Sequence, residues 1–206
     1  MTDSTRRLVD LAQLGETKSY HFLISAIVPR PIAWVSTRAR VGTTNLAPFS
    51  FFQGVSADPP SVMLSIARHK DSGEIKDTLA NIEATSEFVV NLVPEESFEP
   101  MVESSAQLRH GESEIDHLGL ATFPATRVAA PCLVDSPVNF ECRLFRKIPV
   151  GGSALVLGEI LVAHVLDSVL DARGVVDAEK LRPVARLGGS RYLFFDPRSV
   201  RRARRP

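Results

Sequence analysis

The sequence predicts a mainly β fold with a few inserted helices. Short segments rich in β-branched and aromatic residues recur along the chain, separated by Gly, Asn, Asp or Pro. They do not alternate regularly with helical patterns, as they would in a doubly wound α/β sheet. No repeat or linker divides the 206 residues, so we expect one domain over residues 1–206.

The predicted strands differ in pattern. Four of them cover residues 32–37, 46–54, 62–66 and 88–93. Residues 138–144 alternate apolar with polar side chains, which indicates a strand with one buried face. Residues 155–165 are apolar on both sides, as expected for a central strand, and a last strand is predicted around 192–195.

The clearest helical pattern lies in residues 71–85. Ile75, Leu79 and Ile82 recur at helical spacing, and Asp71 stands three residues before Glu74, as in a capping box. A second helix is expected near residues 98–105, with a proline in its first turn, and a third after a cap at residue 177.

The N-terminal segment, residues 1–20, is predicted to be either a short helix or a loosely attached arm. Leu8, Leu11 and Ala12 give weak helical spacing. Pro29 and Pro31 stop any helix, because proline lacks a donor and disfavours the helical conformation of its predecessor.

Charge and hydropathy exclude several classes of partner. The 24 basic and 24 acidic residues cancel, so no overall field attracts nucleic acid or an anionic membrane. The most apolar stretch, residues 154–166, is too short to cross a hydrocarbon core of about 30 Å as a helix. The N-terminus lacks the pattern of a signal peptide, so we expect a cytoplasmic protein.

Known metal and hydrolytic motifs are missing from the sequence. Cys132 and Cys142 match neither a CxxC pair nor zinc-ligand spacing, so we interpret both as reduced core residues. The five histidines are scattered, and no GxSxG or HExxH is present, so we predict no metal site. The common phosphate-binding glycine loops are also missing, so a nucleotide must be held differently.

Two segments have the composition of a cofactor site. Residues 29–52 carry small residues and hydroxyls, which let the backbone approach a flat polar ring, although an ordinary hairpin has the same composition. Residues 65–78 supply cations, hydroxyls and a helix N-terminus, which suit a phosphate but equally a solvated loop that caps a helix.

Six motifs in one order resemble the flavin-reductase-like family, in its flavoredoxin-type branch. They extend from about residue 28 to residue 192. The motifs are PRPIAWVST, TNLAPFSFF, SADPPSVMLSI, KDTLANI, EFVVNLV and RLGGSRY. This resemblance implies an FMN-binding split β-barrel that forms a homodimer with the flavin at the subunit interface.

The resemblance also assigns roles to the matching residues. The ring and ribityl chain would contact Ser36, Thr37, Thr44, Asn45, Leu46, Ala47 and Ser50, and the phosphate would contact Ser65, Arg68, Lys76 and Thr78. Arg30 would bind the cofactor or hold the hairpin. Trp34 would cover the ring or belong to the core. His164 and the Gly188-Gly189 turn would border the nicotinamide side, with a structural role preferred for His164.

The implied reaction is hydride transfer from NADH or NADPH to FMN, with the flavin either kept or released to a monooxygenase partner. The alternative is an electron carrier that keeps FMN tightly bound, accepts electrons from a protein and does not turn over nicotinamide. The basic tail, residues 197–206, is expected to be solvated unless it contacts a polyanion or partner.

Overall fold

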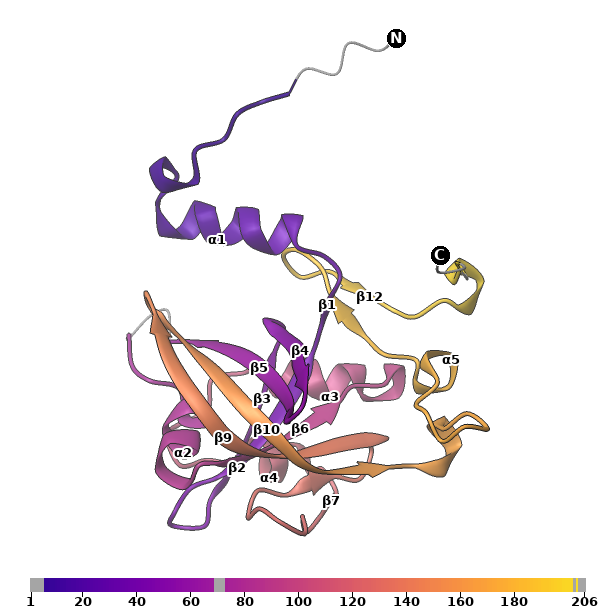
Figure 1. Cartoon of the computed structure of the whole chain (residues 1–206). Coiled ribbons are helices and arrows are strands. Elements are labelled where there is room, and N and C mark those ends of the chain that lie inside the picture. The colour runs from indigo at the N-terminus through magenta and orange to yellow at the C-terminus, as the bar shows by residue number, and fades with distance from the viewer. Residues whose placement is uncertain (1–5, 69–72, 202, 204–206) are drawn as a thin grey trace.

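The structure, a computed structural model, describes residues 6–68, 73–201 and 203 (Figure 1). Most strands belong to one antiparallel sheet of seven, in the order β3-β2-β6-β9-β10-β5-β4. Its strands are β2 (Ala33–Arg38), β3 (Thr44–Phe49), β4 (Phe52–Ala57), β5 (Pro60–Ala67), β6 (Glu87–Leu92), β9 (Val138–Val150) and β10 (Ser153–Val165). Smaller sheets contain β1 (Arg30–Pro31), β11 (Ala185–Arg186) and β12 (Tyr192–Leu193), and β7 (Thr122–Phe123) and β8 (Cys132–Leu133).

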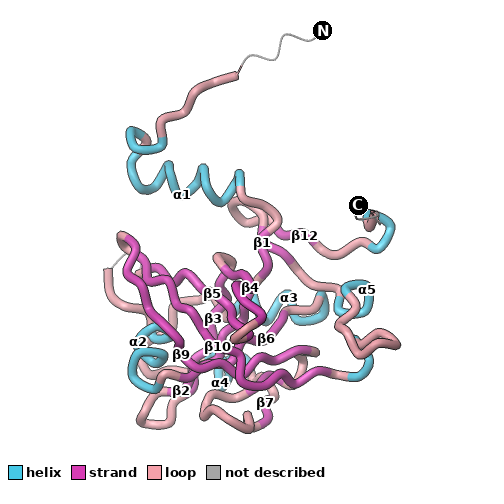
Figure 2. The backbone as a smooth tube through the Cα atoms, in the orientation of Figure 1, coloured by secondary structure: helices cyan, strands magenta, loops and turns pink. Residues whose placement is uncertain are grey.

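Several short helices lie beside this sheet, and Figure 2 shows the longest helix, α1, apart from it. The α-helices are α1 (Gly15–Ala26), α2 (Asp77–Thr85), α3 (Phe98–Glu103), α4 (Glu114–Leu118) and α5 (Ala178–Leu181). Single 3-10 turns are η1 (Leu11–Gln13), η2 (Glu95–Ser97), η3 (Asp167–Val169) and η4 (Pro197–Ser199). No helix in the described part of the chain is long and apolar enough to cross a membrane.

The large sheet curls so that its two edges approach each other. The edge strands β3 and β4 follow one another in the chain, and β3 also contacts β5. The interior is filled by side chains from all sides of the curl, including Val35, Leu64, Phe88 and Val156. A second apolar cluster around Trp34 and Met101 covers the outside of β2 and β3. The predicted mainly β fold is therefore confirmed.

The strand predictions are correct in type, and their boundaries shift. The segment predicted as one strand over residues 46–54 forms two strands, β3 and β4, separated by a bend at Ser50 and Phe51. β9 continues to Val150, beyond the predicted end at residue 144, because it pairs with β10 in a long hairpin. The last strand, β12, ends at Leu193.

The prediction of a single buried face on residues 138–144 is wrong. Val138 and Cys142 are buried as expected, but so are Asn139 and Glu141 on the opposite face, at 2% and 0% exposure. The chain around β7 and β8 covers that face, and their hydrogen-bonding groups supply partners for the polar side chains. Alternation of residue types therefore did not reveal which faces are buried.

The helix predicted over residues 71–85 begins later, at Asp77. Glu74 and Ile75 precede the helix, and Ile75 is 40% exposed, whereas Leu79 and Ile82 are buried as predicted. Asp71 lies outside the described residues. The α3 helix is confirmed, with Pro100 in its first turn, and Asp177 caps α5 by accepting a hydrogen bond from the Glu179 N–H.

The N-terminal helix differs from its sequence pattern. The predicted residues Leu8, Leu11 and Ala12 precede the helix or form the turn η1, whereas the main helix α1 follows and stops before the two prolines. Only Ile24 of α1 is buried, and Figure 1 shows α1 lying apart from the sheet, next to β1 and β12. A helix that buries little of its surface does not need apolar residues at helical spacing. This agrees with the weak pattern in the sequence of α1.

Candidate functional site

The β2–β3 hairpin packs against helix α2 through two side-chain hydrogen bonds. Asn45 Nδ2 donates to Thr78 Oγ1 over 2.8 Å, and Asn81 Nδ2 donates to Thr37 Oγ1 over 3.0 Å. Thr37, Asn45 and Thr78 are all buried. The structure therefore brings together residues from both of the segments that the sequence predicted to form a cofactor site.

Three other predicted residues of the hairpin lie on its opposite face. Ser36 Oγ donates to the Pro131 carbonyl over 2.5 Å, and Thr44 Oγ1 lies 2.7 Å from Ser113 Oγ. Leu46 belongs to the outer apolar cluster. Because successive side chains of a strand point to opposite faces, these three point away from α2.

The N–H of Leu46 is also occupied. It donates to Glu114 Oε2 over 2.8 Å, and burial raises the pKa of the Glu114 carboxyl. Ala47, the next residue of β3, is half-buried and packs against the interior of the curled sheet. The N–H of Leu46 therefore joins β3 to helix α4.

The predicted phosphate-binding residues lie between the end of β5 and the start of α2. Ser65 is half-buried, and its N–H donates to the Phe51 carbonyl over 2.9 Å. Arg68 is exposed, and its Nη1 donates to the Gly73 carbonyl over 3.1 Å. Lys76 directly precedes α2 and does not cap the helix with its side chain. His69, Lys70 and Asp71 lie outside the described residues.

Arg30 joins three parts of the chain. Its guanidinium is nearly buried, and burial lowers the pKa of this group. Nη1 donates to the Ile24 and Ile27 carbonyls, both over 2.6 Å, Nη2 to the Leu187 carbonyl over 3.1 Å, and Nε to Ser50 Oγ over 3.4 Å. Since a guanidinium has five N–H donors, most of them are committed to holding α1 and the segment after β11.

The turn between β11 and β12 is held by further arginines. Arg186 Nη2 donates to the Gly189 carbonyl over 2.7 Å, and Arg191 Nε donates to the Gly188 carbonyl over 3.2 Å. With the bond from Arg30, three successive carbonyl groups each accept from a different arginine. A Cβ atom on Gly188 would lie 3.2 Å from Ser25 Cα, so this close approach to α1 favours glycine.

A cavity of about 460 Å³ lies between this turn and α1. Its walls combine small, polar and apolar residues. The lining residues are His21, Ile24, Ser25, Gly188, Gly189, Ser190 and Arg191. The guanidinium of Arg191 and the small residues in the wall suit an anionic, flat ligand.

A second cavity, of about 550 Å³, is lined in part by η2, β8, η3 and α5. Its lining includes Trp34, Leu133 and Leu181 as apolar walls, with Lys180 and Asp135 among its polar residues. Trp34 is 1% exposed, and its Nε1 donates to Ser104 Oγ over 2.8 Å. Of the two roles open to Trp34, the structure places it in the core.

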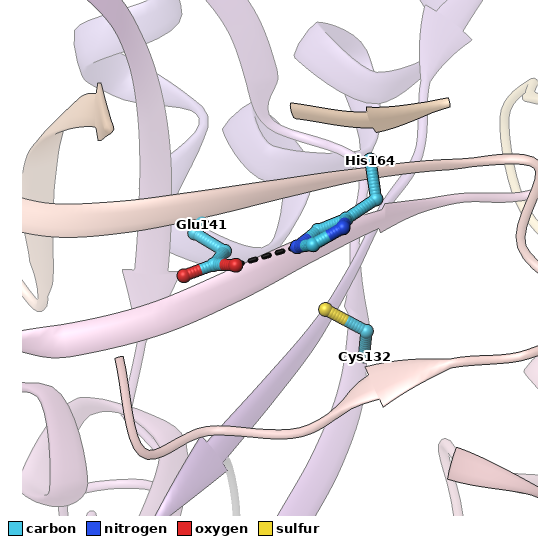
Figure 3. Close-up of side chains that lie close together, drawn as sticks. All are labelled: Cys132, Glu141 and His164. Atoms are coloured by element: carbon cyan, nitrogen blue, oxygen red, sulfur yellow. Dashed lines mark hydrogen bonds and ion pairs between the residues drawn. The ribbon is translucent and has the colours of Figure 1, made fainter. Parts of the chain in front are cut away.

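The sequence did not reveal a cluster formed by Cys132, Glu141 and His164 (Figure 3). His164 Nε2 lies 2.5 Å from Glu141 Oε1, and the Cys132 thiol lies beside this pair. The residues come from β8, β9 and β10, so no short spacing connects them. A charged residue in a strand pattern was the one signal present, and alternation alone placed Glu141 on an exposed face.

The curled antiparallel sheet, closed by the β3–β4 bend and flanked by helices, defines a split-barrel protein. Residues 25–185 match the family model described as the flavin reductase like domain. The chain therefore belongs to the flavin-reductase-like family, as its motifs indicated.

Individual relatives agree with this assignment. An uncharacterized protein of Aquifex aeolicus is 40% identical over 174 residues, which cover 84% of this chain and 88% of that protein. Nitrilotriacetate monooxygenase component B from Bacillus cereus superimposes with a TM-score of 0.89 at 31% identity, over 94% of this chain and 97% of the other. A Shewanella frigidimarina protein with a split barrel domain superimposes with a TM-score of 0.80 at 25% identity, over 95% of both chains.

Proposed function

We propose that this chain binds FMN and transfers hydride from NADH or NADPH to it. Membership of the flavin-reductase-like family supports a flavin-dependent oxidoreductase. The observation that carries the choice of site is the joining of the β2–β3 hairpin to the start of α2 by the Asn45–Thr78 hydrogen bond. A ring-binding surface and a phosphate-binding helix start are thereby held in one rigid unit.

The residues of this site lie at the two ends of β3. Asn45 and Thr78 lie at one end, and Ser50 with Arg30 at the other. At about 3.3 Å per residue, the part of β3 from Asn45 to Phe49 spans about 13 Å.

The phosphate belongs at the start of α2 in this proposal. The side chain of Lys76, the residue before this helix, makes no capping bond to it, and the N–H groups of a helix start attract an anion. Arg68 and Lys76 bring positive charge to this end of the helix. Ser65 and Thr78 add hydroxyl groups. These donors fit a dianionic phosphate.

The other predicted residues of the hairpin support it through hydrogen bonds and packing on both of its faces. They are Ser36, Thr37, Thr44 and Leu46.

The ring then lies toward Ser50 and Arg30, beside the cavity under α1. FMN supplies the hydride-accepting ring when it is bound. The protein contributes orientation: Arg30 fixes α1 and the glycine turn, and the small residues Gly188 and Gly189 leave room for a second flat ring. The nicotinamide would enter there. No side-chain acid or base is required.

A homodimer is part of this proposal, with a second copy covering the flavin. Phe22 of helix α1 is 42% exposed, and Ile27, directly after it, is 58% exposed. On β9, Phe145 is 61% exposed and Val150 is 60% exposed. Burial of such residues at an interface is favourable. We also propose a cytoplasmic location. We further propose that the protein delivers reduced flavin to a monooxygenase, because a structural relative is named as a monooxygenase component.

The test combines a spectral titration with steady-state kinetics. Purified protein titrated with FMN should perturb the flavin absorbance bands and reach saturation. It should then oxidise NADH or NADPH at a rate that depends on FMN. Saturable FMN binding without nicotinamide oxidation would instead favour the electron-carrier function. No binding of FMN would refute both.

A further inference from the structure

A β-bulge in β10 places His164 on the same face as Glu141. Ile160 pairs with Cys142, but two residues later Val162 pairs with Glu141, so Leu161 is an extra residue. Without this bulge His164 would lie opposite Val138, and its side chain would point into the barrel. With it, His164 pairs with Asn139 and shares the outer face of β9.

The third side chain of the cluster comes from β8. Cys132 pairs with Phe123 of β7, and the Phe123 ring packs edge-on against the His164 ring at 5.3 Å between centroids. The Cys132 sulfur, a Glu141 oxygen and a His164 ring nitrogen all lie within 4.8 Å of one another. Figure 3 shows the thiol directed toward the gap between the imidazole and the carboxylate.

Neighbouring groups hold the Glu141 carboxylate in place. Oε1 accepts from the Thr126 N–H at 2.7 Å and from Thr126 Oγ1 at 2.9 Å, and Oε2 accepts from the Arg127 N–H at 2.6 Å. These bonds hold both carboxylate oxygens in fixed directions.

The thiol has no corresponding partner. Cys132 is free and fully buried, and no hydrogen bond of its sulfur is found among the residues that the structure describes. The thiol is thus directed at a buried carboxylate and an imidazole, without a hydrogen bond to explain its position.

We propose that Cys132, Glu141 and His164 form a binding site for a divalent transition-metal ion of the zinc class. Thiolate, imidazole and carboxylate are the ligands that zinc accepts, and three protein ligands leave a fourth position for water. The His164 side chain is 25% exposed, which provides a path for the ion and for that water. The bound ion would replace the direct His164–Glu141 contact and tie β8 to β9 and β10.

Charge and protons balance in this step. Zinc binds the Cys132 sulfur as thiolate, so one proton leaves the thiol for solvent, and the imidazole binds as the neutral ring through Nε2. The thiolate and the carboxylate together carry two negative charges, which the divalent ion neutralises. The bonds from Thr126 and Arg127 remain on the carboxylate and orient it.

The test uses the metal-free full-length protein, prepared with a chelator under reducing conditions and titrated with Co²⁺. We expect a near-ultraviolet thiolate-to-cobalt charge-transfer band that saturates at one ion per chain and disappears when Zn²⁺ is added. Cys132→Ser and His164→Gln should abolish the band. Thr126→Val should weaken Co²⁺ binding by about 10-fold to 100-fold, because it removes a bond to a ligand but no ligand.

Matched controls separate ligation from folding. Cys142→Ala removes the other buried cysteine, which is not in the cluster, and should retain the band. Zn²⁺ should raise the melting temperature of the unmodified protein and of Cys142→Ala, but not that of Cys132→Ser. Absence of a charge-transfer band in the unmodified protein, or its persistence in Cys132→Ser, would overturn the proposal. The measurements require no flavin, so the proposed reductase activity can fail independently.

Discussion

Asn45 Nδ2 donates a 2.8 Å hydrogen bond to Thr78 Oγ1, and this contact between two buried side chains joins strand β3 to the start of helix α2. The two residues are 33 positions apart in the chain. Any ligand held jointly by the hairpin and by this helix start depends on their relative position, which the bond fixes.

The placement of the phosphate can be tested with two flavins. Arg68→Ala, which leaves the buried Asn45–Thr78 bond intact, should raise the Kd for FMN at least about tenfold, because a charge-assisted bond to the phosphate is lost. The Kd for riboflavin, which lacks the phosphate, should change much less. Fluorescence titration with both ligands measures the difference. Arg173→Ala, which changes an exposed arginine beside Asp171, is the control. Equal losses for both flavins would place the phosphate elsewhere.

Arg30→Lys should destabilise the protein by at least about 2 kcal/mol, because lysine cannot reproduce the bonds to Ile24, Ile27 and Leu187 and leaves buried acceptors unsatisfied. Urea unfolding measures the loss. Arg40→Lys is a matched control, since Arg40 also donates to a carbonyl but is exposed. Unchanged stability with weakened flavin binding would instead make Arg30 a ligand-binding residue.

Gly158→Ala should cost about 1–3 kcal/mol by overpacking. A Cβ atom there would lie 2.3 Å from the Phe88 Cζ atom, deep inside the barrel. Gly54→Ala provides the control, because its Cβ would meet nothing within 4 Å. Thermal unfolding compares the two. A second substitution, Phe88→Leu, should recover part of the loss in the Gly158 variant. Equal stability of the two glycine variants would contradict the packing seen here.

Glu141→Gln in the metal-free protein should lower the free energy of unfolding by about 2–3 kcal/mol, because an amide cannot accept on both sides of the carboxyl position. The partly exposed loop 124–131 should also become more sensitive to proteolysis. Glu87→Gln is the comparison, since its carboxylate accepts a single exposed bond from the Ala129 N–H. It should cost no more than about 0.5 kcal/mol. Similar losses in both variants would argue against a stabilising role for the bonds from Thr126 and Arg127 to Glu141.

Residue periodicity was sufficient to predict the strands and two helices, because local patterns of apolar residues determine which segments form them. It failed where a strand face is covered by a segment that is distant in the sequence. Glu141 was predicted to be exposed and is buried beneath the segment around β7 and β8. The start of α2 was predicted six residues early, since a capping pattern in the sequence cannot show where tertiary contacts begin the helix.

By itself the sequence determined the mainly β class, the order of the elements and, through six ordered motifs, the flavin-reductase-like family. Only the tertiary structure decided which side chains meet. It divided the hairpin residues between two faces, used Arg30 to hold α1, and brought Cys132 to Glu141 and His164 through a one-residue bulge at Leu161. The physical reason is that strand register and packing between distant segments set these contacts, and a shift of one residue reverses the face on which a side chain lies.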